Sequence, residues 1–163
     1  MSNPKTLYDT DYAAWARLQR ECLRAGRYSD LDVEHLLEEL SDMGKSERRE
    51  LESRLLVLIA HLLKWQYQLT ALSEHWREFD GRSWRATIVE QRKQLDLLLR
   101  KAPGLTAASA QVVAAIYPDA VDLASKETGL PAETFPLSCP YQVQEILADD
   151  FFPTSAQGSR SSR

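Results

Sequence analysis

Cysteine and glycine are scarce in this chain of 163 residues, which holds two cysteines and six glycines. Cys22 and Cys139 lie far apart and form no Cys-x-x-Cys pair, so the sequence indicates neither a disulfide framework nor a zinc ribbon. No apolar run approaches the roughly 20 residues that cross a bilayer, and the first residues lack the apolar core of a signal peptide. We therefore expect a reduced, cytoplasmic protein that does not contact the membrane.

The common local signatures of catalysis are absent as well. The chain has no phosphate-binding loop, no dinucleotide-binding glycine pattern, no zinc-protease helix motif and no serine-hydrolase elbow. Its net charge is −4, from 20 basic and 24 acidic residues, which argues against a protein that coats DNA by neutralising phosphates. We expect no cofactor, and a non-catalytic protein is favoured over an enzyme.

What the sequence does contain is helical periodicity along most of its length, with 44% hydrophobic residues. Apolar residues recur every three to four positions, while no segment alternates as a strand would. The fold class is therefore predicted to be all-α, with about five helices in one domain over residues 1–153 and a disordered tail over residues 154–163. Besides the long helix described below, caps, glycines and prolines place these helices at about 10–25, 83–102 and 106–128 (kinked at Pro118), with a short one starting at Ser138-Cys139-Pro140.

The longest predicted helix spans about Asp32 to Tyr67. Its apolar positions keep a single phase across Gly44, whereas a turn would normally reset the phase. A straight helix of this length measures roughly 54 Å, and a compact domain of this size is only about 40 Å across. The helix is therefore expected to bend at Gly44 or to project and pack on a second copy. Its second half, residues 51–65, is apolar nearly all round and is predicted to be the centre of the bundle.

A polar cluster at the start of this helix is the first candidate site. Asp32, His35, Glu39 and Asp42 fall on one face, and a carboxylate three residues before a histidine is a spacing that carboxylate-bridged metal sites use. Such sites need two pairs, and this chain has one. The alternatives are a metal or acid/base site, a surface that docks a partner, and a solvated acidic face stabilised by the helix dipole, which we favour.

Two further groups of residues carry weaker signals. His61, Lys64 and Trp65 lie among leucines and suggest either a polar pocket or a buried histidine that is hydrogen-bonded locally. Six arginines and lysines between residues 82 and 101 make the third long helix basic, and Trp84 beside Arg85 could stack a base. Arg82, Trp84, Arg85 and Arg92 therefore suggest a surface for nucleic acid or phosphate. Pairing of these cations with acidic segments of the chain is the favoured alternative, so nucleic acid is not expected as a partner.

Several segments together resemble a bacterial family called domain of unknown function 29. They are YDTDYAAW at residues 8–15, LDVEHLLEEL at 31–40, DMGKSERR at 42–49, HLLKWQYQ at 61–68, SWRATI at 83–88, TGLP at 128–131, TFP at 134–136 and CPY at 139–141. The resemblance covers residues 8–152 in order and implies a small all-helical bacterial protein. It implies no catalytic residue, because the name of the family assigns no biochemical role.

Three hypotheses for function follow from these observations. The first, which we favour, is an interaction or scaffold protein that self-associates through the exposed length of the long helix, most simply as a homodimer. The second is a metal-dependent or acid/base enzyme that uses Asp32, His35, Glu39 and Asp42. The third is a nucleic-acid-linked regulator that uses the basic helix.

Overall fold

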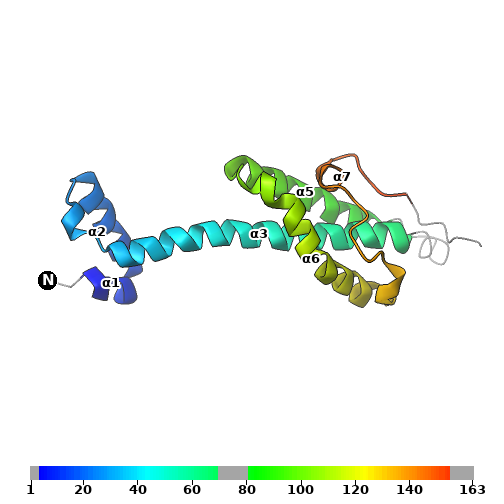
Figure 1. Ribbon diagram of the computed structural model, residues 1–163, viewed down its shortest axis with the longest axis horizontal. Coiled ribbons are helices and arrows are strands. Elements are labelled where there is room, and N and C mark those ends of the chain that lie inside the picture. Colours follow the sequence, from blue (N-terminus) through cyan, green and yellow to red (C-terminus); the bar gives the residue numbers. More distant parts are fainter. Residues whose placement is uncertain (1–3, 70–80, 155–163) are drawn as a thin grey trace, which may run out of the picture. The chain divides into compact units, whose positions relative to one another are not determined.

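A computed structural model describes residues 4–69 and 81–154, with side chains from Leu7 onward (Figure 1). Within these ranges all regular secondary structure is helical, which confirms the predicted fold class. The chain divides into two compact units, Met1–Ser46 and Glu47–Arg163, and the division falls inside the longest helix.

The N-terminal unit begins with two helices, although the sequence predicted one. Helix α1 spans Pro4–Thr10 and α2 spans Tyr12–Arg24. The side chain of Asp11 accepts a hydrogen bond from the backbone N–H of Ala14 at 2.9 Å, so Asp11 is the N-cap of α2, rather than Asp9 or Thr10. A 3₁₀ turn, η1 (Tyr28–Asp30), leads into the long helix.

Helix α3 spans Val33–Tyr67 without interruption, as its continuous apolar phase predicted, and passes through Gly44 as regular helix. The predicted centre of the bundle is confirmed in the C-terminal unit. Its fully buried side chains on this helix are Leu51, Leu55, Leu58, Ile59, Ala60, Leu62 and Leu63. A helix that is apolar on all sides must be covered on all sides, and α5 and α6 supply much of that cover.

Helix α5 spans Arg82–Lys101 and starts two residues earlier than an N-cap at Ser83 would allow. Gly81 occupies the N-cap with a φ of 72°, in the left-handed region. A Cβ atom at Gly81 would lie 2.8 Å from Cδ1 of Leu69 and 3.1 Å from the Trp65 ring. Backbone geometry and close packing therefore both require glycine at this position.

Helix α6 spans Leu105–Thr128, continues through Pro118 and ends at Gly129, also left-handed, as predicted. A 3₁₀ turn, η2 (Ala132–Thr134), and α7 (Val143–Leu147) complete the described chain and contact α6. The last helix was misplaced: it starts after a Gln142 capping box, not at Ser138-Cys139-Pro140. Most of the connection that the sequence predicts at residues 68–81 and of the predicted tail at 154–163 lies outside the described residues.

Candidate functional site

Most of the polar contacts of the N-terminal unit meet in one group, which we name the N-terminal polar cluster. It draws on α1, α2 and the start of α3, and it consists of Tyr8, Tyr12, Trp15, Gln19, Asp32, His35 and Glu39. The sequence had pointed to three of these residues. Tyr8, Tyr12, Trp15 and Gln19 were missed, since nothing in the sequence marks these residues of the first two helices as partners of Asp32 or Glu39.

Asp32 is the centre of the cluster, and its side chain is fully buried. Its Oδ2 atom accepts hydrogen bonds from Nε1 of Trp15 at 3.0 Å and from Nδ1 of His35 at 2.7 Å. Its backbone N–H donates to Oε1 of Gln19 at 2.8 Å. These contacts join the end of the η1 segment to α2 and fix the first turn of α3.

The cluster shifts the pKa values of the Asp32–His35 pair in opposite directions. Burial works against the charge of Asp32, but hydrogen bonds from His35 and Trp15 outweigh it and lower the pKa of this carboxyl group. The hydrogen bond to Asp32 raises the pKa of His35 above its ordinary value. The pair therefore favours a carboxylate facing an imidazolium.

Glu39 is held by two tyrosines rather than by a cation. The hydroxyl of Tyr8 donates to Oε1 at 2.6 Å, and that of Tyr12 donates to Oε2 at 2.7 Å. These hydrogen bonds, that of Tyr8 first, lower the pKa of Glu39. The ring of Tyr8 also stacks on the imidazole of His35, with centroids 3.9 Å apart. The two tyrosines thus tie α1 and α2 to the face of α3.

This geometry separates the four residues that the metal hypothesis had grouped. Asp32 contacts His35, Glu39 binds the two tyrosines, and Asp42 lies 4.0 Å from Nζ of Lys45 at the surface. Among the described residues, no three His, Cys, Asp or Glu side chains are arranged to hold a metal ion. What the cluster can do chemically is orient one imidazole and hold its proton.

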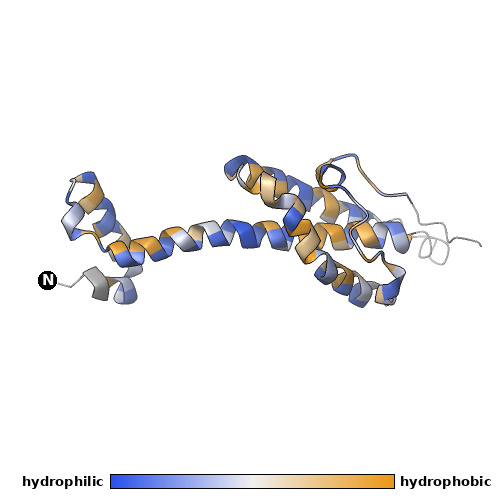
Figure 2. Ribbon diagram, viewed as in Figure 1, coloured by the Kyte–Doolittle hydropathy of each residue, from blue (hydrophilic) through white to orange (hydrophobic). Residues whose placement is uncertain are grey.

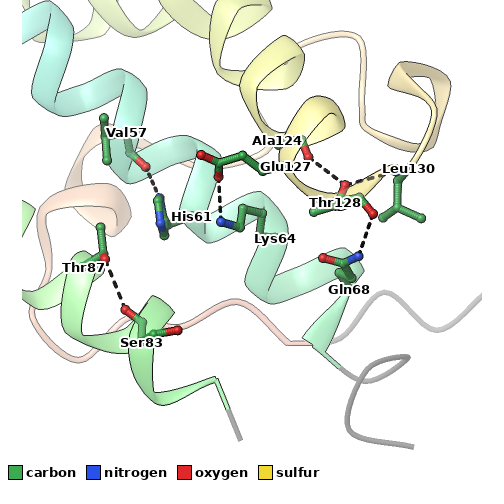
Figure 3. A network of polar contacts seen from close by, with 10 residues as sticks. All are labelled: Val57, His61, Lys64, Gln68, Ser83, Thr87, Ala124, Glu127, Thr128 and Leu130. Atoms are coloured by element: carbon green, nitrogen blue, oxygen red, sulfur yellow. Dashed lines mark hydrogen bonds and ion pairs between the residues drawn. The ribbon is translucent and has the colours of Figure 1, made fainter. Parts of the chain in front are cut away.

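A second network lies in the C-terminal unit and ties α3 to α6 (Figure 3). Nζ of Lys64 is 2.7 Å from Oε2 of Glu127, and it also lies 4.9 Å from the centre of the Trp84 ring. Nδ1 of His61 bonds to the carbonyl of Val57 at 2.8 Å. Burial lowers the pKa of His61, and the charge of Lys64 adds to this effect.

The three residues of the predicted polar pocket therefore have separate tasks. His61 is hydrogen-bonded locally, as the second of the two interpretations predicted. Lys64 is buried in an ion pair. The ring of Trp65 packs on that of Phe152, with centroids 4.9 Å apart. Beside the ion pair, Nε2 of Gln68 donates to the carbonyl of Thr128 at 3.0 Å (Figure 3). These contacts hold the end of α3 against the end of α6.

Arg92 does not take part in the predicted nucleic-acid surface, because it is buried. Its guanidinium donates to the carbonyls of Ile146 at 2.8 Å and Phe151 at 2.7 Å, and at longer distance to those of Glu145 and Asp149. It thereby fixes the C-terminal segment on α5. Sequence reasoning could not find this role, since backbone carbonyls leave no pattern in a sequence.

The other basic residues of α5 are largely engaged within the chain. The guanidinium of Arg85 lies 4.6 Å from the centre of the Phe152 ring. Arg100 pairs with Asp96 at 2.7 Å, and Lys101 lies 3.7 Å from Glu47. Arg82 and Trp84, the remaining members of the predicted surface, also have partners. These contacts engage the basic residues within the chain, but Arg85 and Arg92 contact an aromatic ring and backbone carbonyls rather than the acidic segments that the pairing alternative predicted.

A hollow of about 340 Å³ lies between α6 and the segment that precedes α7. Cys139 lines it, and burial raises the pKa of this thiol. The thiol is therefore kept protonated at neutral pH, which is the opposite of what a reactive cysteine requires.

The N-terminal unit also exposes an apolar stripe along the first turns of α3, visible as orange segments in Figure 2. The stripe consists of Val33, Leu37, Leu40 and Met43, which are 54%, 63%, 64% and 64% exposed. In the same unit, the apolar side chains that are buried among the described residues are those of Trp15 and Cys22. The unit therefore exposes more large apolar side chains than it buries.

The chain matches the model of a known protein family. The model of the family described as "Domain of unknown function DUF29" matches residues 7–152. No curated protein and no solved structure matches the chain. Among the described helices, none has both the length and the apolar character that crossing a membrane requires.

Proposed function

This chain belongs to the DUF29 family, and from the surface of its N-terminal unit we propose that it is a helical interaction protein that associates with a second copy of itself. The observation that carries the proposal is the exposed stripe Val33-Leu37-Leu40-Met43 on α3. Burying a leucine side chain contributes about 1.5–3 kcal/mol. Leaving four large apolar side chains in water therefore forgoes several kcal/mol that a partner would recover.

The small core of the N-terminal unit supports the same proposal. A unit of fewer than 50 residues buries too little surface to be stable by a comfortable margin. Here Trp15 and Cys22 are the buried apolar residues among those described, and much of the remaining interior is the polar cluster. Packing of the apolar stripe on a partner would supply the burial that the unit lacks.

A second copy of α3 fits this surface better than an unrelated partner. Val33, Leu37, Leu40 and Gly44 are spaced by four, three and four residues, the spacing of the contact seam between two paired helices. A Cβ atom at Gly44 would meet no other atom within 4 Å, so the backbone is accessible there for close approach. A stripe that packs on its own copy forms a closed twofold pair, the commonest form of oligomer.

The experiment is a measurement of particle mass over a range of protein concentrations by light scattering. We expect a dimer for the wild type. The double variant Leu37→Asp, Leu40→Asp is expected to weaken the dimer about 100-fold or more. Each substitution replaces a leucine that dimerisation would bury with a carboxylate, whose burial is unfavourable. Since both positions are exposed in the single chain, the helical circular dichroism of the variant should stay unchanged.

Leu97→Asp provides the matched control. Leu97 is an exposed leucine, 45% accessible, on α5 in the C-terminal unit. We expect this variant to dimerise like the wild type. A wild-type chain that stays monomeric at high concentration, or equal weakening by the α3 and α5 variants, would contradict the proposal.

A further inference from the structure

We propose that the contact between Asp32 and His35 is a pH-responsive clasp that sets how strongly the N-terminal unit self-associates. The inference rests on the proposed function, because it concerns regulation of the same surface. The clasp lies at the first turn of α3, and the apolar stripe begins at Val33 in that turn. Whatever loosens the clasp therefore loosens the segment that presents the stripe.

The geometry of Asp32 makes the charge of His35 important. A buried carboxylate is stable only if hydrogen bonds and an opposite charge replace its lost hydration. The Oδ2 atom has two donors, Trp15 and His35, whereas Oδ1 has no hydrogen-bond partner among the described residues. Within this part of the chain His35 is also its ion-pair partner, and no lysine or arginine pairs with it. A neutral His35 can still donate a hydrogen bond through Nδ1–H, but it leaves the buried carboxylate without an opposite charge.

The groups around His35 all act in the same direction. Besides Asp32, the acidic residues Asp9 on α1 and Glu34 on α3 favour its charged form. His35 in turn favours the charged form of Glu39. The ring of Tyr8 stacks on the imidazole, and burial is the one effect that opposes the charge. The imidazole side chain is only 20% exposed, so these neighbours act on it at short range.

The direction of the pH effect follows from linkage between protonation and folding. His35 has a raised pKa in the folded unit, so its contribution to stability is fully present below pH 6.5 and is lost as the pH rises through the raised pKa. Asp32 and Glu39 have lowered pKa values, so their contributions are lost only in more acidic solution, below about pH 4. The folded N-terminal unit should therefore be most stable in mildly acidic solution and become less stable as the pH rises above neutrality.

His61 in the C-terminal unit has the opposite response. Its pKa is lowered by burial, so the folded C-terminal unit favours the neutral imidazole and loses stability as the pH falls. A change from pH 8 to pH 6 is thus expected to stabilise the N-terminal unit while it destabilises the other. This contrast supplies an internal control for any general effect of pH.

The strength of dimerisation measures the state of the Asp32–His35 contact, because the N-terminal unit must be folded before two copies can pair. The apparent dissociation constant rises as the folded population falls, and a unit with so small an apolar core has little stability in reserve. For a partly exposed ion pair we expect dimerisation to be about two- to fivefold tighter at pH 6 than at pH 8.

The test measures the dimerisation constant of the full chain at pH 6 and pH 8, together with the titration of each histidine by NMR. In His35→Gln an amide can still donate to Asp32 but carries no charge, so we expect the two constants to become equal, at the weaker value. His61→Gln and His75→Gln are the controls, and both should keep the wild-type ratio. The His35 ring should titrate above 6.5 and the His61 ring below it.

The readouts separate the two proposals. A wild-type chain that is monomeric at both pH values overturns the proposal of self-association. The NMR titration of His35 independently tests whether the Asp32–His35 contact responds to pH. A His35 pKa at or below 6.5 overturns the clasp even if the chain dimerises. A pH ratio in His35→Gln that equals that of the wild type also overturns it, because the response then comes from another group.

Discussion

Replacement of Arg92 by methionine is expected to destabilise the C-terminal unit by about 3 kcal/mol. Methionine fills much of the same space but donates no hydrogen bond, and Arg92 donates to four backbone carbonyls of residues 145–151. Carbonyls that stay buried without a donor lose the hydrogen bond and are not rehydrated, which costs about 1–3 kcal/mol each where burial persists. Partial opening of the segment limits the total.

Urea denaturation followed by circular dichroism measures this loss. Hydrogen exchange should show, in addition, that amides of residues 143–152 lose protection first, because the guanidinium is what fixes them on α5. Arg100→Met is the matched control, since Arg100 lies on the same helix but is exposed and pairs with Asp96. Its effect should stay within about 0.5 kcal/mol. Equal effects of the two variants would show that the carbonyl contacts contribute no stability.

Trp15→Ala is expected to unfold the N-terminal unit and leave the C-terminal unit folded. Trp15 is 3% exposed and is one of the few apolar side chains that the N-terminal unit buries. Truncating a buried tryptophan costs about 3–5 kcal/mol, and the variant also removes a donor from the buried carboxylate of Asp32. This loss is expected to exceed the free energy of unfolding of a unit with so small an apolar core.

Hydrogen exchange resolved by peptide is the measurement for this prediction. Protection should disappear over α2 and the first turns of α3, while peptides from α5 and α6 keep wild-type protection. Tyr28→Ala removes a large aromatic residue from the same unit, but Tyr28 is 68% exposed, so protection should be retained. Uniform loss of protection over the whole chain in Trp15→Ala would show that the two units unfold as one.

Much of the candidate site was visible in the sequence as residue types but not as partners. The spacing of Asp32 and His35 placed them on one face, because residues three apart are neighbours on a helix. The favoured interpretation of a solvated acidic face is wrong for Asp32, which is buried and contacts His35. The same spacing argument placed Glu39 and Asp42 beside them; Glu39 does lie in the cluster, whereas Asp42 lies outside it near Lys45. Tyr8 on α1 and Tyr12 on α2 both donate hydrogen bonds to the carboxylate of Glu39.

Local signals located the long helices well, and the error at the start of α5 has a tertiary cause. Gly129 ended α6 as predicted because a left-handed residue stops a helix wherever it occurs. Ser83 failed as the cap of α5 because Gly81, packed against Trp65 and Leu69, had already started the helix. A capping residue can be recognised from its type, but the packing that selects one cap over another involves residues distant in the sequence.

The sequence by itself determined the all-helical fold, the long helix α3 and its buried second half, because periodicity and burial of apolar residues depend on neighbours within a few turns. It left open whether α3 continues through Gly44 as regular helix. Only the tertiary structure decided which charges are buried. Arg92 could be assigned to a nucleic-acid surface as readily as to an interior, and Asp32 to a metal site as readily as to a clasp. The choice between such roles depends on which groups from other helices contact the side chain. Local patterns in the sequence do not reveal those contacts.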